Sequence, residues 1–176
     1  MLQIICIIFH CPVWETVFFN NSAKHCCKLF SVDIAKEYKK AAAERQLPVF
    51  VAEIDGAKKY ILPMYGAGLW GAIWGYVSFN EDKNTVYGIF FDHAGETPGL
   101  GAEITNKEKF KQFFANKKAF NESGERILKV TKGASDKGLA ATEVDAISGG
   151  TITSNAVDAM LADYFESYKA FLNNQN

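Results

Sequence analysis

This 176-residue sequence has no cysteine after residue 27, no long apolar run and no excess of either charge. Its 4 cysteines (Cys6, Cys11, Cys26 and Cys27) show no second pair at zinc-ligand spacing, so we expect no metal site. The net charge of -1 provides no basic surface, which sets nucleic-acid binding aside. The sequence has no Ser-His-Asp spacing and no P-loop, and His93 lacks a partner motif, so we assign no catalytic residue.

The first 29 residues differ in character from the rest of the chain. Met1–Phe9 is apolar but falls well short of the roughly 20 residues that span a bilayer, so no transmembrane helix is evident. It also lacks the basic start and cleavage site of a signal peptide. We expect residues 1–29 to be an atypical leader, either disordered or a mis-called start of the reading frame. A membrane-touching segment is the alternative. Residues 30–176 are expected to form one domain.

The first half of this domain predicts one helix and two hairpins. Ser31 is a typical N-cap residue for a helix through about Arg45. Strand-like runs at 49–54 and 58–64 flank an Asp-Gly dipeptide, which strongly favours a hairpin turn. A second pair of strand-like runs, 73–79 and 85–91, is joined by a polar link. The domain is therefore expected to contain at least four antiparallel strands.

The second half predicts two more helices around a short strand. A short amphipathic helix is expected over 106–116 with Phe110, Phe113 and Phe114 inward, followed by a strand at 127–131. The closing helix is expected from about Ser154 to Leu172. Because helices and strands do not alternate regularly, the predicted class is α+β, an antiparallel sheet packed with a long C-terminal amphipathic helix and shorter helices. The apolar stripe of the closing helix is Val157, Met160, Leu161, Tyr164, Phe165, Tyr168, Phe171 and Leu172.

Three loops rich in small residues interrupt this pattern, at 65–71, 92–102 and 145–154. Glycine allows a backbone to approach a ligand closely, and a helix N-terminus offers free N–H groups to an anion. The loop at 145–154 directly precedes the closing helix, so it could be a phosphate site or simply a helix cap. The first loop formally fits a dinucleotide fingerprint, but a strand rather than a helix follows it, so we do not expect NADH to bind here.

The same three loops carry a family resemblance. Asp145-Ala-Ile-Ser-Gly-Gly-Thr151 resembles the flavin-attachment pattern Asp-x-x-Ser/Thr-Gly-Ala-Thr, with Gly150 in place of the usual alanine. Glu96-Thr-Pro-Gly-Leu-Gly101 matches the corresponding loop of FMN-binding domains, and Tyr65–Gly75 is similar to a stretch of the C subunit of the Na+-translocating NADH:quinone reductase. We therefore identify residues 30–173 as resembling this family.

The resemblance implies a covalent cofactor. In the family, the last threonine of the attachment pattern is esterified to the phosphate of FMN by a separate flavin transferase that uses FAD, which points to Thr151 here. Asp145 is expected to assist attachment, although a structural role in a turn is the alternative. Without the resemblance, the hydroxyl residues at this helix start are only N-cap candidates. The remaining residues expected to bind the cofactor in this segment are Ser148, Gly149, Gly150, Thr153 and Ser154.

The resemblance also assigns the other two loops to the flavin. Glu96, Thr97, Gly99, Leu100 and Gly101 are expected to lie against the isoalloxazine, although the same residues would form a Pro-Gly turn in any case.

Leu69 and Trp70 are expected to pack on the flavin or on a partner protein, with closure of the core as an equal alternative. Lys132 is expected to favour reduced, anionic flavin, and its alternative is a solvated surface lysine.

The function implied is that of an electron-carrying subunit of the NADH:quinone reductase, which passes electrons between redox centres of a membrane complex. Its expected partners are the other subunits and, during maturation, the flavin transferase. The expected location is the bacterial cytoplasmic membrane, with the soluble domain on the periplasmic side. Two alternatives remain: the G subunit of an Rnf-type electron-transport complex, and a stand-alone flavin-binding module.

Overall fold

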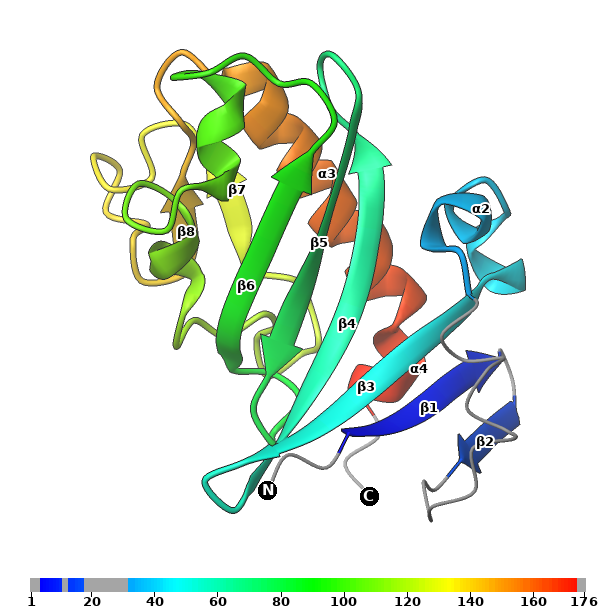
Figure 1. Cartoon of the computed structure of the whole chain (residues 1–176). Helices are drawn as coiled ribbons and strands as arrows, with labels where there is room; N and C mark the ends of the chain where they lie inside the picture. Colours follow the sequence, from blue (N-terminus) through cyan, green and yellow to red (C-terminus); the bar gives the residue numbers. More distant parts are fainter. Residues whose placement is uncertain (1–3, 11–12, 18–31, 174–176) are drawn as a thin grey trace.

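The largest element of the fold is an antiparallel sheet of six strands in the order β2-β1-β3-β4-β5-β6. The structure is a computed structural model that describes residues 4–10, 13–17 and 32–173. The helices α3 and α4 cross one face of the sheet, and a small parallel pair, β7 and β8, lies beside them (Figure 1). The strands are β1 (Ile4–His10), β2 (Val13–Val17), β3 (Gln46–Ile54), β4 (Ala57–Ala67), β5 (Ala72–Phe79), β6 (Val86–His93), β7 (Lys129–Thr131) and β8 (Glu143–Asp145).

The helices are short except for one. They are α2 (Ile34–Tyr38), α3 (Thr151–Ser167) and α4 (Lys169–Leu172), with 3-10 turns η1 (Ala42–Glu44), η2 (Gly101–Thr105) and η3 (Lys111–Phe114). The predicted α+β class with an antiparallel sheet and a long C-terminal helix is confirmed. In the described part of the chain, no helix combines the length and the apolar character needed to cross a lipid bilayer.

Both predicted hairpins are present. The turn between β3 and β4 places Asp55 at φ 53° and Gly56 at φ 77°, the left-handed conformation that a tight hairpin turn requires and that glycine adopts without strain. The apolar stripe predicted for the closing helix is also confirmed, because all eight of its side chains are buried. Residues of α3 and α4 pack on the sheet, and the Tyr168 hydroxyl lies 3.0 Å from the carbonyl oxygen of Pro48.

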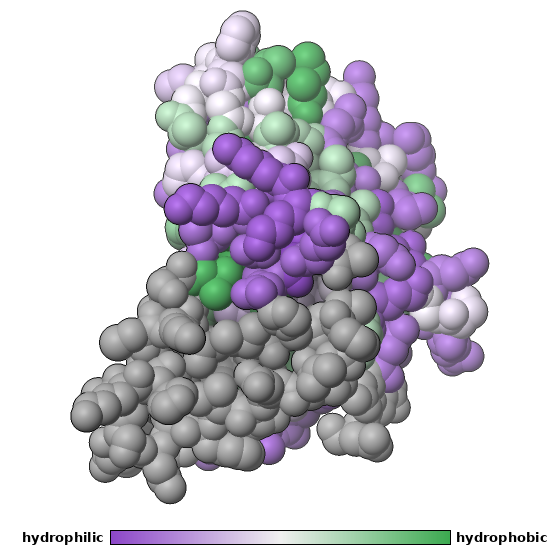
Figure 2. Space-filling model, turned by 90° about the vertical axis from the view of Figure 1, so that its right-hand side faces the viewer, coloured by the Kyte–Doolittle hydropathy of each residue, from purple (hydrophilic) through white to green (hydrophobic). Residues whose placement is uncertain are grey.

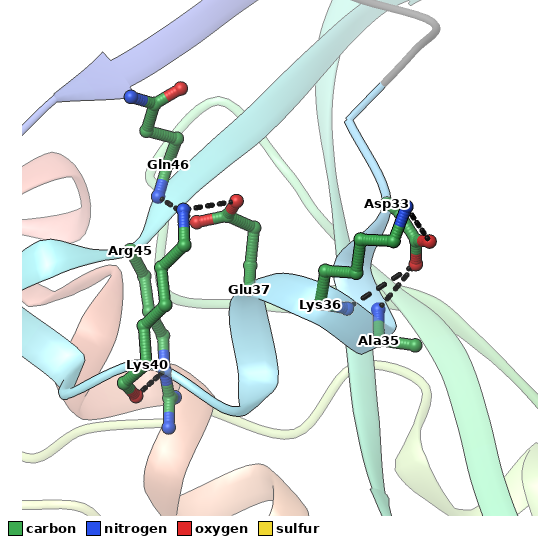
Figure 3. Close-up of polar contacts among 7 residues, drawn as sticks. All are labelled: Asp33, Ala35, Lys36, Glu37, Lys40, Arg45 and Gln46. Carbon is green, nitrogen blue, oxygen red and sulfur yellow. Dashed lines mark hydrogen bonds and ion pairs between the residues drawn. The ribbon is translucent and has the colours of Figure 1, made fainter.

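The first helix is shorter than predicted. Residue 31 lies outside the described residues, and Asp33 caps the helix by accepting hydrogen bonds from the N–H groups of Ala35 (3.1 Å) and Lys36 (3.3 Å) (Figure 3). The helix ends at Tyr38. The Glu37 carboxylate accepts a hydrogen bond of 2.7 Å from the N–H of Gln46, which ties the helix to the start of β3. Around α2, the face shown in Figure 2 is largely hydrophilic.

Three other local predictions were wrong. The segment 106–116 forms turns and η3 rather than a helix, because the Asn106 side chain accepts the N–H groups of Glu108 and Lys109 and competes with helical bonding. Phe113 is consequently 48% exposed instead of inward. The loop predicted from residue 65 begins later, because β4 continues through Ala67.

The third correction concerns the closing helix, which begins at Thr151 rather than Ser154. The residue expected to carry the cofactor therefore occupies the first helical position.

Candidate functional site

The three loops singled out in the sequence meet at one pocket. The pocket has a volume of about 430 Å³. The β4–β5 turn and the start of α3, which both contribute to its wall, lie at the same end of the molecule (Figure 1). Its walls come from the β4–β5 turn, the loop after β6 and the first turn of α3. The lining residues are Leu69, Trp70, Glu96, Thr97, Leu100, Gly101, Gly149, Gly150, Thr151, Ile152 and Thr153.

The first turn of α3 faces this pocket without a side-chain cap. Gly150 is the N-cap residue and provides no side-chain hydrogen bond, and the first turn contains no acidic residue. The initial N–H groups of a helix lack intrahelical partners, and their dipole favours a negative charge. The site can therefore hold an anionic group beside the hydroxyl of Thr151.

Two hydroxyl groups near the start of α3 form hydrogen bonds within the protein. Ser154 is buried, donates to the Gly150 carbonyl (2.9 Å) and accepts the N–H of Ile147 (3.0 Å), so it closes the turn behind the pocket. The hydroxyl of Thr153, also buried, donates to the Glu96 carboxylate at 2.5 Å. Thr151, by contrast, is half-buried and lines the pocket.

Glycine is required where the loops come together. At Gly149, φ is 74°, and a Cβ atom would lie 2.6 Å from Leu100 Cδ2. At Gly101, a Cβ atom would lie 2.5 Å from a carboxylate oxygen of Glu96. Only a residue without a side chain fits at either position, so the glycines set how closely the loop after β6 approaches the start of α3.

The rim of the pocket is apolar and exposed. Trp70 is 68% exposed, Ile152 59%, Leu69 43% and Leu100 42%. Hydrophobic residues also gather at the upper end of the surface in Figure 2, the end at which the β4–β5 turn lies. These exposures do not indicate closure of the core, the alternative considered for Leu69 and Trp70. Ile152 was not among the predicted site residues, although an apolar side chain amid the small and hydroxyl residues of the 145–154 loop was a usable signal.

The other predicted residues lie outside the pocket wall. Ser148 is exposed in the loop before α3, and Gly99 forms the left-handed position of the Pro-Gly turn at φ 75°. Lys132 is exposed at the turn after β7. Asp145 ends β8 and accepts hydrogen bonds from the N–H and hydroxyl of Ser135. The hydroxyl bond holds the pKa of Asp145 below its ordinary value, although partial burial acts in the opposite direction.

These features define a small domain that binds an anionic cofactor. Its pocket combines a helix N-terminus for a phosphate, an apolar rim for an aromatic ring and glycines that permit close backbone approach. Comparison with known proteins agrees, since the profile of the FMN-binding domain family matches residues 68–166.

The similar proteins identify the branch of this family. The crystal structure of the C subunit of the Na(+)-translocating NADH-quinone reductase from Parabacteroides distasonis is 44% identical, with a TM-score of 0.78, over 98% of this chain and 80% of that one. The same subunit of Pseudomonas aeruginosa is 37% identical over 74% of this chain and 52% of its own length. Its counterpart in Pasteurella multocida is 47% identical over 62% of this chain and 42% of its own length.

The chain belongs to the family of FMN-binding C subunits of the Na+-translocating NADH-quinone reductase, which confirms the resemblance stated from the sequence. It spans about half the length of the curated relatives that it matches.

Proposed function

We propose that this protein is an electron-carrying subunit of a Na+-translocating NADH:quinone reductase and holds FMN through a phosphoester bond to Thr151. The observation that carries the proposal is the position of Thr151. It is the first residue of α3, it lines the pocket, and the helix end beside it is uncapped. A phosphate attached there would be stabilised by N–H groups and dipole by roughly 0.3–1 kcal/mol.

The pocket residues fit FMN in two further respects. The walls formed by Leu69, Trp70 and Leu100 offer apolar surface for a flat ring system. Because Gly149 and Gly150 have no side chains, their backbone atoms form the pocket wall directly and can contact a bound ligand. When bound, FMN supplies the electron-transfer chemistry, while this chain holds the group, orients it and sets its electrostatic surroundings.

Attachment requires a separate flavin transferase. The Thr151 hydroxyl oxygen would form the new bond to the FMN phosphorus of FAD, the pyrophosphate bond would break, AMP would leave and the hydroxyl proton would be released. Asp145 is held by Ser135 at the end of β8, away from the pocket wall. We therefore propose that Asp145 acts in attachment only while the transferase is bound.

The later partners of the chain are the other subunits of the complex, which it meets at the periplasmic side of the cytoplasmic membrane.

Intact mass spectrometry tests this assignment. The wild-type chain is co-expressed with a flavin transferase and FAD, beside Thr151→Ala and the control Ser123→Ala, which removes an exposed hydroxyl outside both the attachment pattern and the pocket. Wild type and Ser123→Ala should gain one FMN moiety, and Thr151→Ala should gain none. Covalent flavin on Thr151→Ala would refute the attachment site.

Assembly needs its own measurement. The flavinylated chain is expressed with the other subunits, and the complex is isolated from membranes through a tag on a different subunit. We expect the flavin of this chain to be recovered with the complex and to be reduced on addition of NADH. If the chain is absent from complexes that otherwise assemble, the stand-alone module is the better description.

A further inference from the structure

Glu96 is the one charged side chain among the described residues that line the pocket. It is 4% exposed, and no lysine or arginine of the described part of the chain lies within ion-pair distance of it. Lys132, the cation expected near the flavin from the family resemblance, is exposed and does not line the pocket. The charge built into this wall is therefore negative.

Two hydrogen bonds hold the Glu96 carboxylate in place. One oxygen accepts the N–H of Trp70 at 2.9 Å, and the other accepts the hydroxyl of Thr153 at 2.5 Å. Acceptance at both oxygens is the bonding pattern of an ionised carboxylate. Both donors are neutral, so they orient the negative charge without neutralising it through an ion pair.

Two glycines leave room for this arrangement. A Cβ atom at Gly68 would lie 2.5 Å from one carboxylate oxygen of Glu96, and a Cβ atom at Gly101 would lie 2.5 Å from the other. The carboxylate is thus enclosed between the β4–β5 turn and the loop after β6. It has little freedom to swing out of the pocket wall into solvent.

We propose that the Glu96 carboxylate acts as a fixed negative charge that lowers the midpoint potential of the flavin in this pocket. The proposal rests on the proposed function, in that FMN must occupy the site. Reduction adds electrons to the flavin, and a nearby anion with few waters around it opposes the added charge. Thr153 is the positioning residue that keeps this anion in the wall.

A spectroelectrochemical titration of the flavinylated chain tests the proposal. Glu96→Gln removes the charge and keeps the shape, and Glu122→Gln removes an exposed charge that does not line the pocket. At a fixed ambient potential, we expect Glu96→Gln to raise the ratio of reduced to oxidised flavin about tenfold, roughly 30 mV for a two-electron couple. Glu122→Gln should titrate as the wild type does. A wild-type midpoint potential for Glu96→Gln with FMN attached would overturn the proposal.

A second variant, Thr153→Val, should shift the midpoint potential in the opposite direction. Thr153→Val removes the hydroxyl donor but keeps the carboxylate, so the uncompensated charge grows and the midpoint potential should fall. This variant decides the matter if Glu96→Gln does not fold, since an unchanged or higher potential in Thr153→Val would overturn the proposal. A purely structural role would lower the stability of both variants, or the fraction of chains that acquire FMN, without moving the potentials in opposite directions. Absence of FMN from the wild type, shown by mass, would instead refute the proposed function and the proposal with it.

Discussion

Gly101 is where the pocket should be most sensitive to one added carbon atom. The Cβ atom of Gly101→Ala would lie 2.5 Å from Glu96 Oε2 and closer still to the Thr153 hydroxyl oxygen. Since the two groups are hydrogen-bonded at 2.5 Å and both are buried, neither can move aside without breaking that bond. We expect the free energy of unfolding to fall by about 1–3 kcal/mol, as for overpacking of a well-packed interior.

Gly95→Ala is the matched control, because it lies in the same loop and its nearest neighbour would be the Trp70 carbonyl oxygen at 3.8 Å. This variant should change the unfolding free energy by no more than about 0.5 kcal/mol. The assay is urea unfolding of the unflavinylated chain, in which a loss of about 1–3 kcal/mol is a roughly 5- to 150-fold change in the folding equilibrium. If Gly101→Ala and Gly95→Ala unfold at the same urea concentration with the same slope, the close contact at Gly101 is not real.

Three further predictions concern other parts of the molecule. Asp158→Ala should lower the unfolding free energy by about 1–3 kcal/mol in urea titrations, because it breaks a two-bond ion pair with Arg126 (2.9 and 3.0 Å) that is only partly exposed. Ser135→Ala should destabilise the chain at about pH 7, and this effect should shrink as the pH falls below about 3.8, because the lowered pKa of Asp145 stabilises the fold above its unfolded pKa and this contribution is lost as the pH falls through the folded pKa. A destabilisation that stays constant as the pH falls below about 3.8 would contradict it. Trp70→Ser should change the unfolding free energy by less than about 0.5 kcal/mol while weakening recovery of the chain with the complex, and a large stability loss would show that Trp70 closes the core instead.

The parts of the fold that were predictable carry local signals. The stripe of α3 repeats at three and four residues, and the Asp55-Gly56 turn needs two left-handed residues in a row. The parts that were not predictable depend on distant partners. β4 runs on through Gly66 because the missing side chain makes room for Met160 of α3, at 3.2 Å from where a Cβ atom would lie. β8 is too short, at 3 residues, to show a period.

The candidate site divides in the same way. Loops 65–71, 92–102 and 145–154 were visible as small-residue segments, but nothing in their spacing along the chain brings them to one pocket. The family resemblance supplied that step. The bond between Glu96 and Thr153 joins residues 57 positions apart, so neither its existence nor the buried charge could be derived from the sequence pattern.

Polar contacts at two residues, Thr153 and Asp158, fix the N-terminal half of α3. Thr153 is bonded to Glu96 at the pocket, and one turn further along Asp158 is bonded to Arg126 and to the N–H of Val130 at 2.9 Å. These bonds reach α3 from different neighbours, the loop after β6 and the segment entering β7. The helix start that carries Thr151 is therefore held from two sides, which leaves a cofactor attached there little freedom to shift. Under the function proposed above, an electron carrier that keeps a constant distance to its redox partners needs this rigidity at the point of attachment.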